Sequence, residues 1–146
     1  MKLFDSIENQ DEFEELMIII SDIISLFNNT KTKLTSHLPP VPLHTMLSEI
    51  AVYIINIVCE HILTLNDISV DSCTPIDTII SKFGVMNGYD QTVAEDIRFL
   101  LRSSLSEIIG MWKTGETKLT STQVRSMIRA LFSNTDHRSN ALSLIK

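Results

Sequence analysis

The stretch TSTQVRSMIRALF, residues 120–132, decides the fold class because it carries both the start signal and the core-facing pattern of an α-helix. Thr120 and Gln123 have the spacing of a capping box, in which each side chain bonds the backbone N–H of the other residue. The apolar residues that follow recur at intervals of three and four; they are Val124, Met127, Ile128, Leu131 and Phe132. This spacing places them on one face of a helix.

The same pattern predicts helices along the rest of the chain. We expect helices over residues 11–28, 47–65, 75–83, 92–113 and 121–132, and a last one that Asn134 or Thr135 caps. No stretch alternates polar and apolar residues long enough to require a strand. The sequence therefore predicts an all-α bundle of about five to six helices.

The predicted helices suggest three segments. Residues 1–28 form an acidic amino-terminal helix, residues 29–42 a proline-containing linker, and residues 43–146 a carboxy-terminal helical bundle, the whole forming one domain. The helix over residues 47–65 is apolar on nearly all sides, so we expect it at the centre of the bundle. Its longest apolar run, residues 50–59, is interrupted by Asn56 and is short for a membrane span, so we expect no membrane insertion.

Composition and charge exclude several classes of function. Of the 146 residues 44% are hydrophobic and 21% charged, as in a packed protein, and the formal net charge is −6. An acidic chain lacks the overall positive charge that binding to nucleic acid or to anionic membranes requires. The charge is uneven, because residues 1–22 hold seven acids and one base whereas residues 123–146 hold four bases and one acid.

No motif in the chain points to catalysis. There is no phosphate-binding glycine loop, no nucleophile elbow and no metalloprotease motif. The best metal candidate, Cys59 and His61 with Cys73, lacks a fourth ligand, and residues two apart on a helix point to different sides. We therefore predict a protein without enzyme activity, metal or cofactor, in which both cysteines are free thiols.

Three residues are candidates for binding a partner from their pattern alone. Trp112 has the helical spacing of a core aromatic, which is the favoured interpretation, with a partner-facing anchor as the alternative. Arg125 and Arg129 lie four residues apart on a face without apolar residues; a solvated face is favoured, and contact with an acidic partner is the alternative. The basic last two helices also permit a rival hypothesis, a small nucleic-acid-binding helix-turn-helix.

The end of the chain resembles a known family. SMIRALFSNTDHRSNALSLIK, residues 126–146, is similar to the carboxy-terminal end of the Zeste-white-ten family of tethering and kinetochore proteins. ILTLNDIS at residues 62–69 and LRSSLSEIIGMW at residues 101–112 fall in the order expected of that family's tail. The resemblance covers residues 43–146 and includes polar positions, such as Asn134 and Arg138, that core packing alone does not dictate. Family members are several times longer, and their coiled-coil amino-terminal region has no counterpart here.

The resemblance implies a scaffold subunit of two helical-rod complexes. One is a tether at the endoplasmic reticulum that captures Golgi-derived retrograde vesicles together with SNARE proteins. The other is the Rod–Zwilch complex at mitotic kinetochores, which recruits dynein and dynactin and sustains the spindle checkpoint. The implied direct partner is a large Rod-type or NAG-type solenoid subunit in the cytoplasm. With the resemblance, Arg138 joins Trp112, Arg125 and Arg129 as a predicted contact residue.

Overall fold

The computed structural model of the chain describes residues 10–86 and 89–146. Over these residues it contains seven α-helices and one short 3-10 turn and no strand, which confirms the all-α fold with one or two helices more than expected. The elements are α1 (Gln10–Thr35), α2 (Pro40–Leu63), α3 (Val70–Lys82), η1 (Phe83–Val85), α4 (Thr92–Arg102), α5 (Leu105–Thr114), α6 (Ser121–Leu131) and α7 (Asp136–Leu144).

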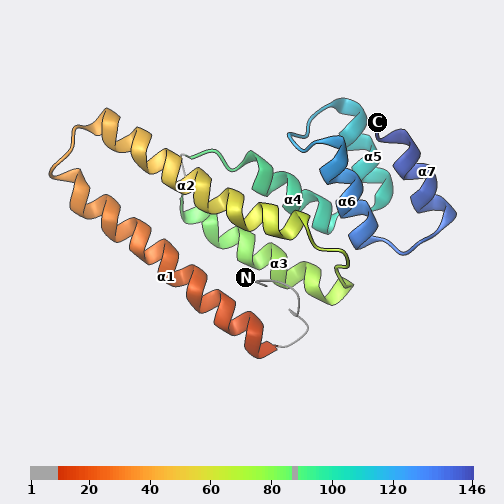
Figure 1. Cartoon of the computed structure of the whole chain (residues 1–146), viewed down its shortest axis with the longest axis horizontal. Helices are drawn as coiled ribbons and strands as arrows, with labels where there is room; N and C mark the ends of the chain where they lie inside the picture. Colours follow the sequence, from red (N-terminus) through yellow and green to blue (C-terminus); the bar gives the residue numbers. More distant parts are fainter. Residues whose placement is uncertain (1–9, 87–88) are drawn as a thin grey trace.

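The helices form two groups (Figure 1). The long helices α1 and α2 form a hairpin, against which α3 and α4 pack, and the short helices α5, α6 and α7 gather at the end away from the hairpin turn. Contacts between α2 and α6 join the two groups. One cluster of buried apolar side chains runs from Leu16 on α1 to Ile145 after α7, so both groups share a core.

The predicted linker over residues 29–42 is wrong in its bounds. Helix α1 continues to Thr35, and α2 already begins at Pro40, which leaves only residues 36–39 between them. Leu34 packs against the core seven residues after the buried Phe27, so tertiary contact extends the helix through a polar segment of weak helix propensity. Pro40 and Pro42 fit the first turn of α2, where backbone N–H groups have no partner within the helix.

Two further helix boundaries differ from the predicted ones because serine caps were overlooked. Helix α3 begins after Ser69, whose side chain accepts a hydrogen bond from the Ser72 N–H, so Pro75 lies inside the helix and not at its start. The helix expected over residues 92–113 is two helices, α4 and α5. Ser104 forms a capping box with Glu107, and its extended backbone separates them.

Helix α2 contacts α1, α4 and α6, as expected of a central helix, but it is not enclosed. One side of it buries eight residues, whereas Ile50, Tyr53 and Ile57 remain exposed on another side. By length and composition alone, α2 would be long and apolar enough to cross a membrane. Core helices pass the same test, and the buried side of α2 packs within this bundle.

Candidate partner-binding surface

The surface with the predicted contact residues is built on α6 and α7. The Thr120–Gln123 capping box that starts α6 is confirmed, with Thr120 Oγ1 accepting from the Gln123 N–H at 3.3 Å. Thr135 caps α7 in the same manner by accepting from the Arg138 N–H at 3.3 Å. The two caps fix where each helix begins, and α7 then packs against both α6 and α5.

Arg138 has a structural task within this helix pair. Its Nη1 atom donates hydrogen bonds to the carbonyl oxygens of Arg129 and Phe132, at 3.2 and 2.8 Å. These carbonyls lie at the carboxyl end of α6, where no further turn of helix supplies an N–H partner. A guanidinium there also meets the negative end of the helix dipole. Arg138 therefore ties the end of α6 to the first turn of α7.

Arg125 and Arg129 have different surroundings although they lie one helical turn apart. Arg125 is partly buried, and its Nη1 donates to the carbonyl oxygen of Ile145 at 3.4 Å. Because Ile145 is fully buried, this contact helps to hold the end of the chain against α6. Arg129 is exposed. Of the three predicted arginines, Arg129 is the one whose side chain remains available to a partner.

Trp112 lies on α5 and is half-buried against the hydrophobic core. This position agrees with the favoured interpretation of a core aromatic and still leaves part of the indole accessible. Helix α7 contacts both α5 and α6, so Trp112, Arg129 and Arg138 belong to the same three-helix group. Their role in binding a partner stays a prediction.

The connection between α5 and α6 is held by a carboxylate that the sequence analysis missed. Asp96 on α4 accepts hydrogen bonds through Oδ2 from the Thr117 hydroxyl at 2.8 Å and from the Lys118 N–H at 2.7 Å. These partners lie more than 20 residues away in the sequence, so no local motif could have indicated them. Asp96 thereby fixes the orientation of the α5–α7 group relative to α4.

Two further hydrogen bonds hold the α5–α7 group on its other side. The Ile68 N–H donates to the Ala130 carbonyl at 3.0 Å, and the Ser126 hydroxyl donates to the Leu63 carbonyl at 3.3 Å. The first contact joins α6 to the connection between α2 and α3, and the second joins α6 to the last residue of α2. The α5–α7 group is therefore held by polar contacts on two sides as well as by the shared core.

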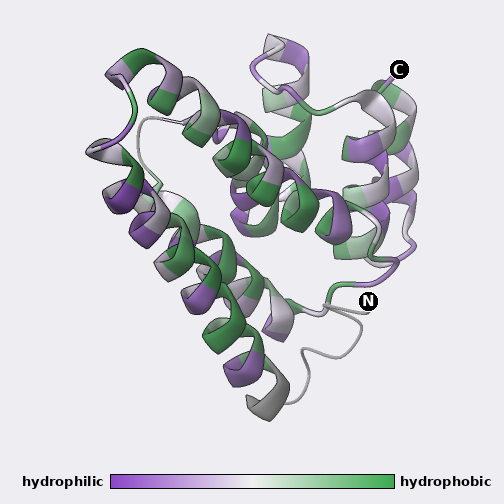
Figure 2. Ribbon diagram, turned by 60° about the vertical axis from the view of Figure 1, so that its left-hand side comes forward, coloured by the Kyte–Doolittle hydropathy of each residue, from purple (hydrophilic) through white to green (hydrophobic). Residues whose placement is uncertain are grey.

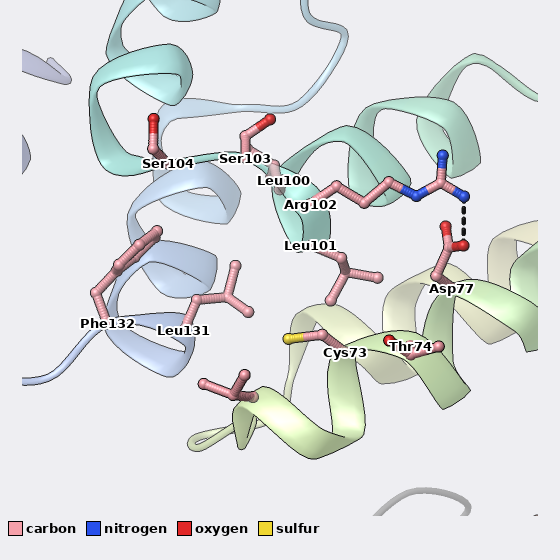
Figure 3. Close-up of a pocket in the computed structure, with 11 residues that line it drawn as sticks. Cys73, Thr74, Asp77, Leu100, Leu101, Arg102, Ser103, Ser104, Leu131 and Phe132 are labelled. Atoms are coloured by element: carbon pink, nitrogen blue, oxygen red, sulfur yellow. Dashed lines mark hydrogen bonds and ion pairs between the residues drawn. The ribbon is translucent and has the colours of Figure 1, made fainter.

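A cleft of about 620 Å³ lies where α3, α4 and α6 meet (Figure 3). Its lining is mainly apolar and includes Leu101, Leu131, Phe132 and the Cys73 side chain, and an Arg102–Asp77 ion pair lies on its rim. The cleft has no set of groups suited to acid–base or nucleophilic chemistry.

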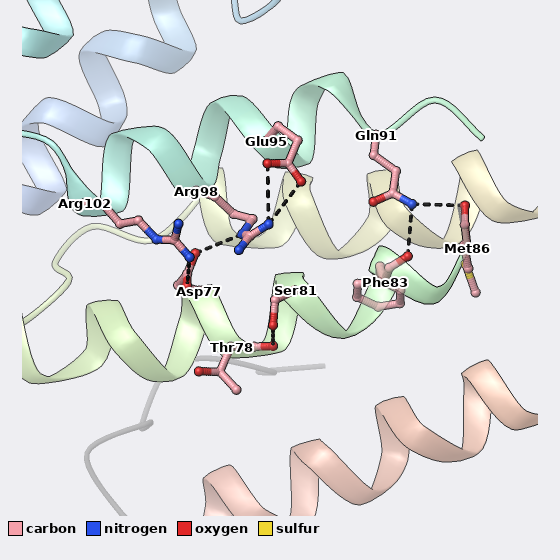
Figure 4. Close-up of polar contacts among 9 residues, drawn as sticks. All are labelled: Asp77, Thr78, Ser81, Phe83, Met86, Gln91, Glu95, Arg98 and Arg102. Carbon is pink, nitrogen blue, oxygen red and sulfur yellow. Dashed lines mark hydrogen bonds and ion pairs between the residues drawn. The ribbon is translucent and has the colours of Figure 1, made fainter. Parts of the chain in front are cut away.

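Asp77 is the centre of a small charge network between α3 and α4 (Figure 4). Arg98 Nε donates to its Oδ1 at 3.0 Å, Arg102 donates to its Oδ2, and Arg98 also pairs with Glu95. Burial raises the pKa of Asp77, but the hydrogen bonds from Arg102 and Arg98 outweigh burial and hold this pKa below its ordinary value of 3.8. The network joins two helices and keeps Asp77 charged.

The cysteines and histidines form no metal site within the described residues, where no group of three potential ligands comes together. Both thiols are free. Burial, assisted by the charge of Glu60, raises the pKa of Cys59 to about 12, and burial also raises the pKa of Cys73. Neither cysteine has the lowered pKa of a nucleophile or of a metal ligand.

The two helix groups differ in charge. Residues 103–146 contain six Lys and Arg against three Asp and Glu, whereas residues 10–102 contain five against thirteen. Because α5, α6 and α7 lie together at one end of the molecule, the positive charge is concentrated there (Figure 1). Such a separation favours an acidic partner surface at that end.

Comparison with known proteins finds a family match at this end of the molecule. Residues 84–145 match the family model described as the ZW10 C-terminal helical domain, which confirms the resemblance seen in the sequence. The matched residues comprise α4 to α7, whereas α1, α2 and α3 lie outside the match, although the resemblance was expected from residue 43. Searches of curated proteins and of solved structures found no match.

Proposed function

We propose that this chain, whose residues 84–145 match the model of the ZW10 C-terminal helical domain, is a non-enzymatic interaction module that docks on a large helical subunit. The observation that carries the proposal is that the family match, which covers α4 to α7, includes the positively charged helix group α5–α7. The docking surface is formed by α5, α6 and α7, and it presents Arg129 to the partner.

The partner in this proposal is a solenoid subunit of the Rod or NAG type with an acidic docking surface. Through it the chain serves the endoplasmic reticulum tether in Golgi-to-ER transport, in association with SNARE proteins, or the kinetochore complex that recruits dynein in mitosis. The family match and the solvent-exposed arginine on α6 support this assignment. In this proposal the chain acts only by presenting one surface to its partner. Such binding requires complementary shape and charge and no reacting group.

The arginines have separate roles in this proposal. Arg129 contacts the partner directly, because its side chain is exposed while its backbone is held in α6. Arg138 acts as a positioning residue, since it binds the carbonyl oxygens of Arg129 and Phe132. Arg125 holds the end of the chain in place through Ile145. Trp112 contributes the accessible part of its side chain as an apolar anchor.

Affinity capture tests the proposal. The immobilised 146-residue chain is incubated with cytosol from its source, and the retained proteins are identified by mass spectrometry. Recovery of a Rod-type or NAG-type subunit with the wild type and with Lys82→Glu, but not with Arg129→Glu, is the expected result. Lys82 is the matched control because it is an exposed cation in the last turn of α3, outside the family match. A folded wild-type chain that retains neither subunit would refute the proposal.

A further inference from the structure

An apolar surface lies on the α1–α2 hairpin, away from the proposed docking helices α5 to α7 (Figure 1). On α1 the side chains of Ile19 and Leu26 are 46% and 68% exposed, and on α2 Tyr53 is 67% exposed. A shallow groove of about 160 Å³ runs between the two helices, lined by Ile23, Leu26, Phe27, Thr30, Leu47, Ile50 and Ile54. Figure 2 shows that apolar residues recur along both helices of this hairpin and alternate on α1 with hydrophilic ones. We call this surface the hairpin face.

Exposed apolar residues scattered singly over a surface need no partner, but those of the hairpin face have a regular arrangement. Ile19, Ile23 and Leu26 are spaced by four and three residues, so they form one stripe along α1. Ile50 and Ile57 form a second stripe on α2, on the other side of the groove. Two parallel stripes with a groove between them have the shape that receives the stripe of another helix.

The charges beside the α1 stripe specify what that other helix is. Glu15 and Lys33 are both exposed and 18 residues apart, which is five complete turns, so they lie on the same flank of α1. Glu15 precedes the apolar stripe and Lys33 follows it. A helix whose acidic end and basic end lie on one flank is complementary to an antiparallel copy of itself, because equivalent flanks meet about a twofold axis.

The spacing along α1 allows both kinds of contact in one register. If the twofold axis passes between Asp22 and Ile23, Ile19 of one copy lies opposite Leu26 of the other, and the reverse pair forms by symmetry. In this register Glu15 is three residues from the position that faces Lys33 of the second copy, roughly 4.5 Å along the helix axis. Two long side chains bridge that distance.

We propose that the hairpin face is a homodimer interface, in which two copies of the chain pack α1 against α1 in antiparallel orientation. The apolar stripes provide the affinity, and the Glu15–Lys33 pairs select the orientation, since surface ion pairs contribute little energy but discriminate between arrangements. The two α5–α7 groups remain outside the contact, so the dimer is bivalent towards the partner of the proposed function. The dimer itself does not depend on that function.

The register has one unfavourable consequence that makes it testable. Asp22 is exposed and lies next to the axis, so the two Asp22 carboxylates of a dimer approach one another at the edge of the contact. Replacing Asp22 by Asn removes this repulsion while keeping the shape of the side chain. Asp22→Asn therefore strengthens the dimer in this register. It has no such effect if the hairpin face binds something other than a second copy in this register.

The test measures molar mass against concentration by analytical ultracentrifugation of the full chain. The wild type is expected to form dimers, and Leu26→Glu to weaken them by about tenfold or more, as loss of a central apolar contact does. Val70→Asp is the matched control, because Val70 is 85% exposed on α3 and a carboxylate is favourable in a first helical turn. Circular dichroism verifies that each variant retains its helical content.

Charge exchange tests the antiparallel orientation. Lys33→Glu should weaken the dimer by about two- to tenfold, in keeping with two symmetric surface pairs, and the double variant Glu15→Lys with Lys33→Glu should restore it. A chain that stays monomeric at every concentration, a dimer that tolerates Leu26→Glu, or a double variant without rescue overturns the proposal. Monomers that float with phospholipid vesicles, and cease to do so in Leu26→Glu, would assign the face to a membrane surface instead.

Discussion

The Nη1 atom of Arg138 lies 2.8 Å from the carbonyl oxygen of Phe132, at the point where α6 ends and the chain turns towards α7. The same atom reaches the Arg129 carbonyl, so one guanidinium satisfies two acceptors at a helix terminus. This contact explains why a polar residue is needed at position 138. It also links Arg129 to the packing of α7. The backbone carbonyl of Arg129, the residue that binds the partner in our proposal, accepts a hydrogen bond from Arg138 on α7.

Removing this guanidinium should destabilise the chain. We expect Arg138→Ala to lower the free energy of unfolding by about 1–3 kcal/mol, because two carbonyl oxygens lose their donor. Arg129→Ala should change it by less than about 0.5 kcal/mol, since the Arg129 side chain is exposed. Urea denaturation followed by circular dichroism measures both values. Equal effects of the two substitutions would mean that Arg138 does not tie α6 to α7.

Asp96 should stabilise the junction between α4 and the α5–α7 group as Arg138 stabilises the contact between α6 and α7. Asp96→Ala leaves the Thr117 hydroxyl and the Lys118 N–H without their acceptor, so we expect a loss of about 1–3 kcal/mol. Asp67→Ala, at an exposed position between α2 and α3, is the matched control and should be nearly neutral. Hydrogen exchange should show faster opening of residues 115–119 in Asp96→Ala alone. Unchanged exchange there would contradict the assigned role.

The charge network around Asp77 predicts a dependence of stability on pH. The pKa of Asp77 is lowered in the folded chain, so its charged form stabilises the fold above the ordinary value of 3.8 and loses this effect as the pH falls through the lowered pKa. Asp77→Asn should therefore be less stable than the wild type at pH 7, and the difference should shrink below about pH 4. Thermal melts across this range measure it. A difference independent of pH would show that the ion pairs contribute nothing.

The two thiols should react at very different rates. Cys59 is buried with its pKa raised to about 12, whereas Cys73 is partly exposed and lines the cleft between α3, α4 and α6. We expect a thiol reagent such as Ellman's reagent to modify one cysteine per folded chain, and none in Cys73→Ser until denaturant is added. Rapid modification of the folded Cys73→Ser variant would show that Cys59 is accessible.

Local signals in the sequence were sufficient for the fold class and for several helix ends. The capping box of Thr120 and Gln123 and the cap at Thr135 both occur as predicted, because each depends on residues within one turn. Ser104 and Glu107 carry the same signal, but it was overlooked within a longer apolar periodicity. The error at the end of α1 has another cause, since only the packing of Leu34 against distant helices extends it.

The candidate surface was less predictable than the fold. The sequence indicated the arginines, but it could not show that Arg138 and Arg125 bind carbonyl oxygens within the chain, because those contacts depend on how α7 folds back on α6. Asp96 gave no local signal either, as its partners follow it by more than 20 residues. Long-range polar contacts of this kind become visible only in the folded structure.

The most direct test of the proposed docking function is the affinity of the purified chain for an isolated Rod-type or NAG-type subunit, measured by biolayer interferometry. We expect saturable binding that Arg129→Glu weakens by about tenfold or more and that Lys82→Glu leaves unchanged. Binding that is equally strong in both variants would remove Arg129 from the interface. The absence of binding to either subunit by a folded wild-type chain would contradict the docking function itself.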